Sequence, residues 1–142
     1  MIADLEARYD DDVDALLTFV RIPSVSTDPS HAADVRAAAE HLAERLTVAG
    51  LDDAEVLETD GHPLVSAAWR RAPDAPTVLV YGHYDVQPPE PLARWTTPPF
   101  EPSVRDGRIY ARGVSDDKAP LHRHRRRILP ARTVRGGSHG LA

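Results

Sequence analysis

A short continuous run of apolar residues, Val78-Leu79-Val80-Tyr81, places the strongest constraint on the fold of this chain. The run follows Pro76, and we expect it to form a strand over residues 77–81. Because its residues do not alternate between apolar and polar, the pattern is typical of a strand that is covered on both faces. Helical patterns precede this strand, so the sequence as a whole predicts a layered α/β domain.

Two helices are expected before this strand, and shorter strands on either side of it. Apolar residues recur at three- and four-residue steps over residues 3–20, and again from Asp28-Pro29 to about Ala49. Asp28 is expected to cap the second helix, and Gly50 occupies the position of a left-handed cap after it. Further strands are expected over residues 54–59, 63–69 and 108–112, with turns at Asp60-Gly61 and Asp106-Gly107.

The composition fits one ordinary globular domain and excludes several classes of protein. The chain has 142 residues, of which 42% are hydrophobic and 27% charged. The absence of cysteine excludes disulfide scaffolds, thiolate zinc sites and thiol nucleophiles. No apolar run has the length of a transmembrane helix, and the acidic start lacks the layout of a secretion signal. We therefore expect a cytoplasmic protein with no membrane partner.

The first group of residues suited to chemistry is Gly82-His83-Tyr84-Asp85, directly after the expected buried strand. In an extended chain the side chains of His83 and Asp85 point to the same side, and sites in open α/β sheets lie at the carboxyl ends of strands. One imidazole nitrogen of His83 could bind a metal while Asp85 accepts the proton of the other nitrogen. The simpler alternative is an ordinary hydrogen bond between the two side chains.

The second group is Gly113-Val114-Ser115-Asp116-Asp117-Lys118, which also follows an expected strand. Adjacent carboxylates repel each other unless a cation or a base neutralises them, and one carboxylate can bridge two divalent ions. The alternative is a surface turn in which Lys118 satisfies one acid without any metal. A Pro-rich loop over residues 85–104 separates the two groups, and its Trp95 and Phe100 are expected to pack within the loop.

Taken together, these motifs resemble one family, the dinuclear zinc peptidases related to aminoacylase, carnosinase and glutamate carboxypeptidase. The resemblance covers residues 1 to about 118, and the Gln-Pro-Pro and Pro-Pro-Phe-Glu-Pro sequences are similar to the dipeptidase branch. The segments that carry it are residues 19–26, 80–88, 98–102, 106–113 and 115–118, together with Trp95. The resemblance implies the N-terminal part of a zinc-peptidase catalytic domain, with helices packed on a mixed β-sheet and metal-dependent hydrolysis of an amide bond.

The resemblance also implies a role for each site residue. His83 would be a ligand of one metal, Asp85 the catalytic residue that orients and polarises His83, and Asp116 the ligand that bridges two Zn²⁺ ions or other divalent metals. Asp117 would have a supporting role, and the peptide bond between Asp116 and Asp117 would be cis. Three further histidines match no family ligand and are expected in surface roles; they are His31, His41 and His62.

The family's other features lie downstream of Lys118 and are not recognisable in this sequence. Family members act on dipeptides or acyl-amino acids and form homodimers, and their general-base glutamate, remaining ligands and dimerisation domain follow the second motif. No Asp or Glu occurs after Asp117 in this chain. We therefore expect residues 1–118 to be a partial catalytic domain that is truncated, marginally stable and inactive alone.

Residues 119–142 form a basic tail with six Arg and no acidic residue, which we expect to be disordered. Three explanations remain open: an out-of-frame reading of the family's downstream region, a non-catalytic fragment that makes contacts through its arginines, or a natural extension that binds nucleic acid. The last is the least favoured, because the tail lacks a recognisable module and aromatic stacking groups.

Overall fold

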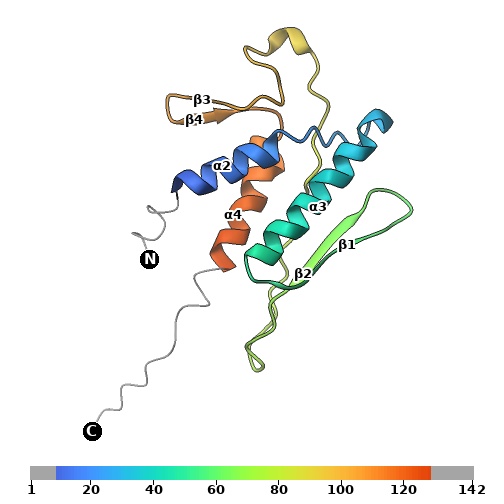
Figure 1. The fold of residues 1–142 in the computed structure, drawn as a ribbon, viewed down its shortest axis with the longest axis vertical. Coiled ribbons are helices and arrows are strands. Elements are labelled where there is room, and N and C mark those ends of the chain that lie inside the picture. Colours follow the sequence, from blue (N-terminus) through green and yellow to red (C-terminus); the bar gives the residue numbers. More distant parts are fainter. Residues whose placement is uncertain (1–8, 129–142) are drawn as a thin grey trace.

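The computed structural model describes residues 9–128, with side chains described as far as residue 123, as a mixed helix-and-sheet fold (Figure 1). Three α-helices span Tyr9–Val20 (α2), Ala32–Val48 (α3) and Ala119–Ile128 (α4). Strand β1 (Asp52–Leu57) pairs antiparallel with β2 (Leu64–Ala68), and β3 (Ser103–Arg105) pairs antiparallel with β4 (Arg108–Tyr110). Short helical turns cover Pro29–His31 (η1), Leu92–Arg94 (η2) and Val114–Lys118 (η3).

The two N-terminal helices confirm the sequence pattern. Helix α2 occupies the part of the predicted segment 3–20 that lies within the described residues. The side chain of Asp28 accepts a hydrogen bond of 2.9 Å from the backbone N–H of Ser30, so it caps the turn η1 that leads into α3. Helix α3 ends at Val48, and Gly50 has a φ of 79°, the left-handed conformation expected just after a helix.

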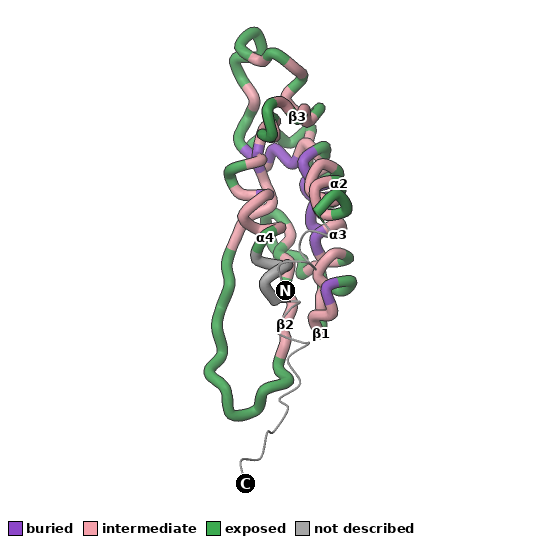
Figure 2. The backbone as a smooth tube through the Cα atoms, turned by 90° about the vertical axis from the view of Figure 1, so that its left-hand side faces the viewer, coloured by how far each residue is buried: buried purple, intermediate pink, exposed green. Residues whose placement is uncertain are grey.

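The buried core lies where the end of α2 meets α3 and two extended segments (Figure 2). Phe19 and Val20 come from α2, while Val25 and Val86 belong to extended segments that form a parallel bridge. Helix α3 contributes Val35, Ala38, Ala39 and Leu42. On its other side α3 packs against the β1–β2 hairpin, whose two strands were both predicted. The mixed α/β character that was predicted is therefore confirmed.

The predicted buried strand over residues 77–81 is not formed. Val78 is 80% exposed and Leu79 is 90% exposed, and the chain from residue 70 to residue 81 runs along the outside of the molecule (Figure 2). A strand requires a neighbour that pairs with its backbone groups. Within residues 9–128, β1 pairs only with β2 and β3 only with β4, so the segment lacks that neighbour. The strand predicted over residues 108–112 is present, but shorter, as β4.

The expectation of disorder from residue 119 onward is also wrong for its first part. Residues 119–128 form helix α4, which follows η3 directly and packs against it. Arg has a high helix propensity, and the first turn of α4 places Leu121 near Gly82 and His122 near Asp12. The rest of the predicted tail, residues 129–142, lies outside the described residues. No helix within the described part of the chain is long and apolar enough to cross a membrane.

Candidate metal centre

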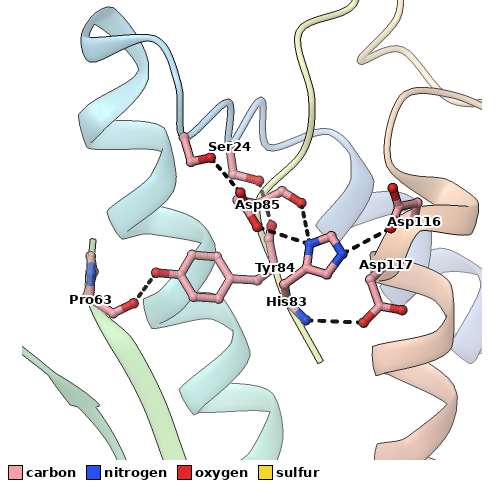
Figure 3. Close-up of polar contacts among 8 residues, drawn as sticks. Ser24, Pro63, His83, Tyr84, Asp85, Asp116 and Asp117 are labelled. Atoms are coloured by element: carbon pink, nitrogen blue, oxygen red, sulfur yellow. Dashed lines mark hydrogen bonds and ion pairs between the residues drawn. The ribbon is translucent and has the colours of Figure 1, made fainter. Parts of the chain in front are cut away.

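The first motif lies on an extended segment that is held in place by the chain before α3. The backbone N–H of Val86 donates to the carbonyl of Ser24 over 2.9 Å, and the hydroxyl of Ser24 donates to the carbonyl of Tyr84 over 2.7 Å. Because the segment is extended, His83 and Asp85 point to one side and Tyr84 to the other, where its hydroxyl donates to the carbonyl of Pro63 (Figure 3).

The imidazole of His83 is oriented by Asp85, as the sequence predicts. The Nδ1 atom of His83 lies 3.0 Å from Oδ1 of Asp85. The other carboxylate oxygen of Asp85 accepts a hydrogen bond from the hydroxyl of Ser26. When Nδ1 carries the proton that is donated to Asp85, the lone pair of Nε2 is free on the opposite side of the ring. This is the arrangement in which a histidine acts as a metal ligand.

The second motif forms a tight turn that begins at Gly113. Gly113 has a φ of 80°, and a Cβ atom at this position would lie 2.3 Å from Cγ1 of Val86. Only glycine therefore fits this position, because both the backbone conformation and the close approach exclude a side chain. Asp116 then departs from helical geometry (φ −140°, ψ 92°), and the bond between Asp116 and Asp117 is cis, as the resemblance implies.

The turn brings Asp116 to the free face of His83 (Figure 3). The Oδ1 atom of Asp116 lies 3.0 Å from Nε2 of His83, although the two residues are separated by 33 positions in the sequence. Asp116 is 79% exposed and His83 38% exposed, so the pair is open to solvent. The structure thus brings together all three predicted site residues, His83, Asp85 and Asp116.

Asp117 ties the two motifs together through the backbone. Its Oδ2 atom accepts a hydrogen bond of 3.1 Å from the N–H of His83. Gly82 makes this contact possible, since a Cβ atom there would lie 2.8 Å from the same oxygen and 2.8 Å from Cδ1 of Leu121. Sequence reasoning predicted a supporting role for Asp117 but missed the steric role of Gly82, for which the glycine directly before His83 was the available signal.

The turn lies at the surface, but Lys118 does not neutralise its carboxylates, so that part of the alternative is wrong. Its side chain is fully buried and points away from Asp116 towards the end of α2. There its Nζ atom donates to the carbonyl oxygens of Phe19 and Ile22, over 3.1 and 2.7 Å. The predicted compensation by lysine fails because these carbonyls, and not the carboxylates, bind the ammonium group.

The carboxylates around His83 change its protonation. Partial burial works to lower the pKa of His83, but the hydrogen bonds to Asp116 and Asp85 outweigh it and raise the pKa above its ordinary value. Within the structure a proton on Nε2 would bridge His83 to Asp116. A cation held between the same two atoms would take the place of that proton, because metal ligands bind in their deprotonated form.

The donor atoms of this pair are of the kinds that bind zinc, but they are too few for a complete zinc site. Imidazole nitrogen and carboxylate oxygen are ordinary zinc ligands, and a zinc ion takes about four. His83 and Asp116 supply two of them, and no group of three or more metal-ligating side chains occurs within the described part of the chain. A complete site would need further ligands from elsewhere.

The remaining candidates lie apart from this pair. The indole nitrogen of Trp95 donates to the carbonyl of Pro89 over 2.7 Å, which agrees with simple packing within the loop. His31 binds the carboxylate of Asp34, and Nε2 of His62 lies 2.8 Å from the carbonyl oxygen of Ser26. His41 is partly exposed and stacks on the ring of Phe19.

The fold resembles the catalytic domains of metallopeptidases, as comparisons with known proteins show. Residues 79–122 match the model of peptidase family M20/M25/M40. The match contains both motifs and the whole of the loop between them. This part of the chain is therefore similar to that family.

The similarity extends over most of the chain but over a small part of each relative. The Cys-Gly metallodipeptidase dug1 of Schizosaccharomyces pombe is 34% identical over 127 residues, which cover 82% of this chain and 27% of that protein. A succinyl-diaminopimelate desuccinylase of Thiobacillus denitrificans is 48% identical over 63 residues, 44% of this chain and 16% of that enzyme. The structure of human carnosine dipeptidase 1 superposes with a TM-score of 0.78 at 26% identity, covering 92% of this chain and 30% of the dipeptidase.

Proposed function

We propose that this chain carries one half of the metal site of a metal-dependent peptidase. The observation that supports it most directly is the 3.0 Å separation of His83 Nε2 and Asp116 Oδ1, with Nδ1 of His83 bound to Asp85 on the other side of the ring. In this proposal His83 and Asp116 bind Zn²⁺, and Asp85 is the residue that orients His83. The complete site would hold two such ions.

Each side chain has a distinct task in the proposed site. Zn²⁺, when bound, would polarise an amide carbonyl and favour the ionised form of a water molecule. Asp85 holds the proton on Nδ1 of His83, so that Nε2 presents its lone pair, and Ser26 fixes the second oxygen of Asp85. Asp117 fixes the backbone of His83 and thereby the position of the ring. The proposal assigns none of these side chains as the general base.

The proposed substrate of the complete site is a dipeptide or an acyl-amino acid. The support is the similarity to a Cys-Gly metallodipeptidase and to a succinyl-diaminopimelate desuccinylase. The chain spans only 16–27% of the length of these two relatives, so the substrate is proposed for the complete site. A cytoplasmic location and a homodimer of the complete enzyme stay predictions from the sequence and the resemblance.

Zinc titration of the full chain tests the proposal. We expect calorimetry to show binding that weakens in both His83→Ala and Asp116→Ala, because each variant removes one ligand atom. His31→Gln is the matched control, since it removes a histidine that is bound to a carboxylate elsewhere. Equal zinc affinity in the wild type and both site variants would overturn the proposal, and it would favour a non-catalytic protein whose tail makes its contacts.

A further inference from the structure

A buried lysine lies directly behind the candidate metal centre. Lys118 is 0% exposed. Among the buried residues of the described part of the chain, it is the only one that carries a charge. Its Nζ atom lies 3.1 Å from the carbonyl oxygen of Phe19, 2.7 Å from that of Ile22 and 4.9 Å from the centre of the Phe19 ring. These contacts join two parts of the chain that are up to 99 positions apart.

The groups around this ammonium compensate for its burial. A charged group that is taken out of water is costly unless hydrogen bonds replace its hydration. The two carbonyls lie at or just beyond the C-terminus of α2, where the helix dipole favours a cation. The aromatic face of Phe19 adds a further favourable contact. An apolar side chain would fill the same space without these costs, so a charge here needs a reason.

That reason lies in the turn from which Asp116 projects. The turn is fixed at its start by Gly113, which packs against Val86, and it is closed by a hydrogen bond of 3.1 Å from the N–H of Lys118 to the carbonyl of Gly113. The Lys118 side chain fixes the other end to α2. Asp116 lies between these two fixed points with a non-helical backbone.

We propose that Lys118 is a positioning residue, which anchors the end of the turn to α2 so that Asp116 is held at the Nε2 face of His83. An extended backbone at Asp116 is not stabilised by helical hydrogen bonds, so its direction depends on both flanking anchors. Loss of the ammonium would free one end of the turn and let the exposed Asp116 carboxylate move away from His83. The role is indirect, since the hydrogen bonds of the Lys118 side chain go to the carbonyls of Phe19 and Ile22 and not to His83 or Asp116.

The test replaces the ammonium group alone. Because the chain contains no cysteine, Lys118→Cys can be alkylated in the unfolded state with 2-bromoethylamine or with 1-bromopropane and then refolded. The first product restores an ammonium at the place of Nζ, and the second ends in a methyl group of similar size. Val35→Ala is the control for a general loss of stability, because Val35 is fully buried in α3 and belongs to neither motif.

The first readout needs no metal. The ¹⁵N chemical shift of Nε2 of His83 reports its hydrogen bond to Asp116, and Asp116→Ala gives the value expected when that bond is lost. We expect the propyl form to give the shift of Asp116→Ala, and the aminoethyl form and Val35→Ala to give the wild-type shift. If the propyl form does not refold, Lys118→Gln replaces it, with a shift between the two limits expected. A wild-type shift in the folded propyl form or in Lys118→Gln would overturn the role of Lys118.

The second readout rests on the proposed function. Zinc affinity is expected to fall about tenfold or more in the propyl form and to recover in the aminoethyl form, as for other residues that orient metal ligands. Failure of the wild type to bind zinc would remove the proposed function but leave the shift experiment valid. Loss of zinc affinity in the aminoethyl form and Val35→Ala to the same extent as in the propyl form would show a merely structural role, and it would overturn the inference.

Discussion

Nε2 of His83 and Oδ1 of Asp116 lie 3.0 Å apart at the meeting point of two motifs that are 33 positions apart in the sequence. Among the hydrogen bonds of the described residues, these two atoms have only each other as partners, while Nδ1 of His83 is bound to Asp85. Two sets of backbone contacts hold the pair, one through Ser24 and Val86 and the other through Gly113. The pair is therefore a consequence of how the extended segment and the η3 turn are anchored, and this can be tested through stability.

The contribution of His83 to stability should decrease as the pH rises. Its pKa is raised in the folded protein, so the stabilisation is fully present below the unfolded pKa of 6.5 and is lost as the pH rises through the folded value. At pH 5.5 we expect the free energy of unfolding of the wild type to exceed that of His83→Gln by about 1 kcal/mol or less, because both partners are partly exposed. At pH 8 the difference should be smaller. Urea unfolding at the two pH values measures this, and a difference that grows with pH would contradict it.

Replacement of Gly113 by alanine should be strongly destabilising. The new Cβ atom would lie 2.3 Å from Val86, on a backbone with a φ of 80°, so strain and overpacking add to a loss of about 2–4 kcal/mol. Gly107→Ala is the matched control, since Gly107 has a φ of 71° but no atom within 4 Å of the new Cβ. It should lose only about 1 kcal/mol from backbone strain. Equal losses in urea unfolding would mean that the contact with Val86 is not formed in solution.

The relation of His83 to Asp85 could be predicted from the sequence because it is local. Two residues that are separated by one position on an extended chain share a side, whatever the rest of the fold does. The approach of Asp116 could not be derived from spacing alone, and the prediction came from the resemblance to a family. The helices could be predicted because they too are local: their apolar periodicity depends only on residues within a few turns of one another.

The segment from Val78 to Tyr81 shows where local patterns are insufficient. Its composition predicts a strand, but a strand is stable only when another strand pairs with it, and no such neighbour occurs within residues 9–128. Lys118 shows the same limit in a side chain. Nothing in the sequence near Lys118 indicates that the carbonyls of Phe19 and Ile22, which are almost 100 positions away, would bind it instead of the adjacent acids.

The buried lysine should make the protein more stable at alkaline pH. Burial lowers the pKa of Lys118 to about 7 from 10.5, against an opposing effect of Asp85. The cost of the buried charge is fully present below pH 7, and it is relieved between 7 and 10.5, where the folded state releases a proton that the unfolded state still holds. From pH 6.5 to pH 9.5 the free energy of unfolding of the wild type should rise by about 3 kcal/mol relative to Lys118→Met, at about 1.4 kcal/mol per unit. Parallel pH profiles from urea unfolding would show that the amine is not desolvated.

Replacement of Gly82 by alanine should disturb Asp117 more than it disturbs the fold. The new Cβ atom would meet the ends of two side chains, Asp117 and Leu121, at 2.8 Å, and both can rotate away for about 1 kcal/mol or somewhat more. The rotation breaks the hydrogen bond from the N–H of His83, so this amide should exchange its proton faster and change its chemical shift. Gly61→Ala should do neither, since its nearest atom is 3.8 Å away. An unchanged His83 amide would contradict the link between the motifs.

A charge placed in the exposed apolar segment should reduce self-association without unfolding the protein. Unpaired apolar strand-like segments are sites of aggregation, and Leu79 is 90% exposed at the centre of this one. We expect Leu79→Lys to aggregate more slowly than the wild type in light scattering, with a free energy of unfolding within about 0.5 kcal/mol of it. Val48→Lys is the control, because Val48 is also exposed, at 64%, but lies at the end of α3. If Leu79→Lys unfolds the protein, Leu79 is buried in solution. The segment would then be the covered strand that the sequence predicts.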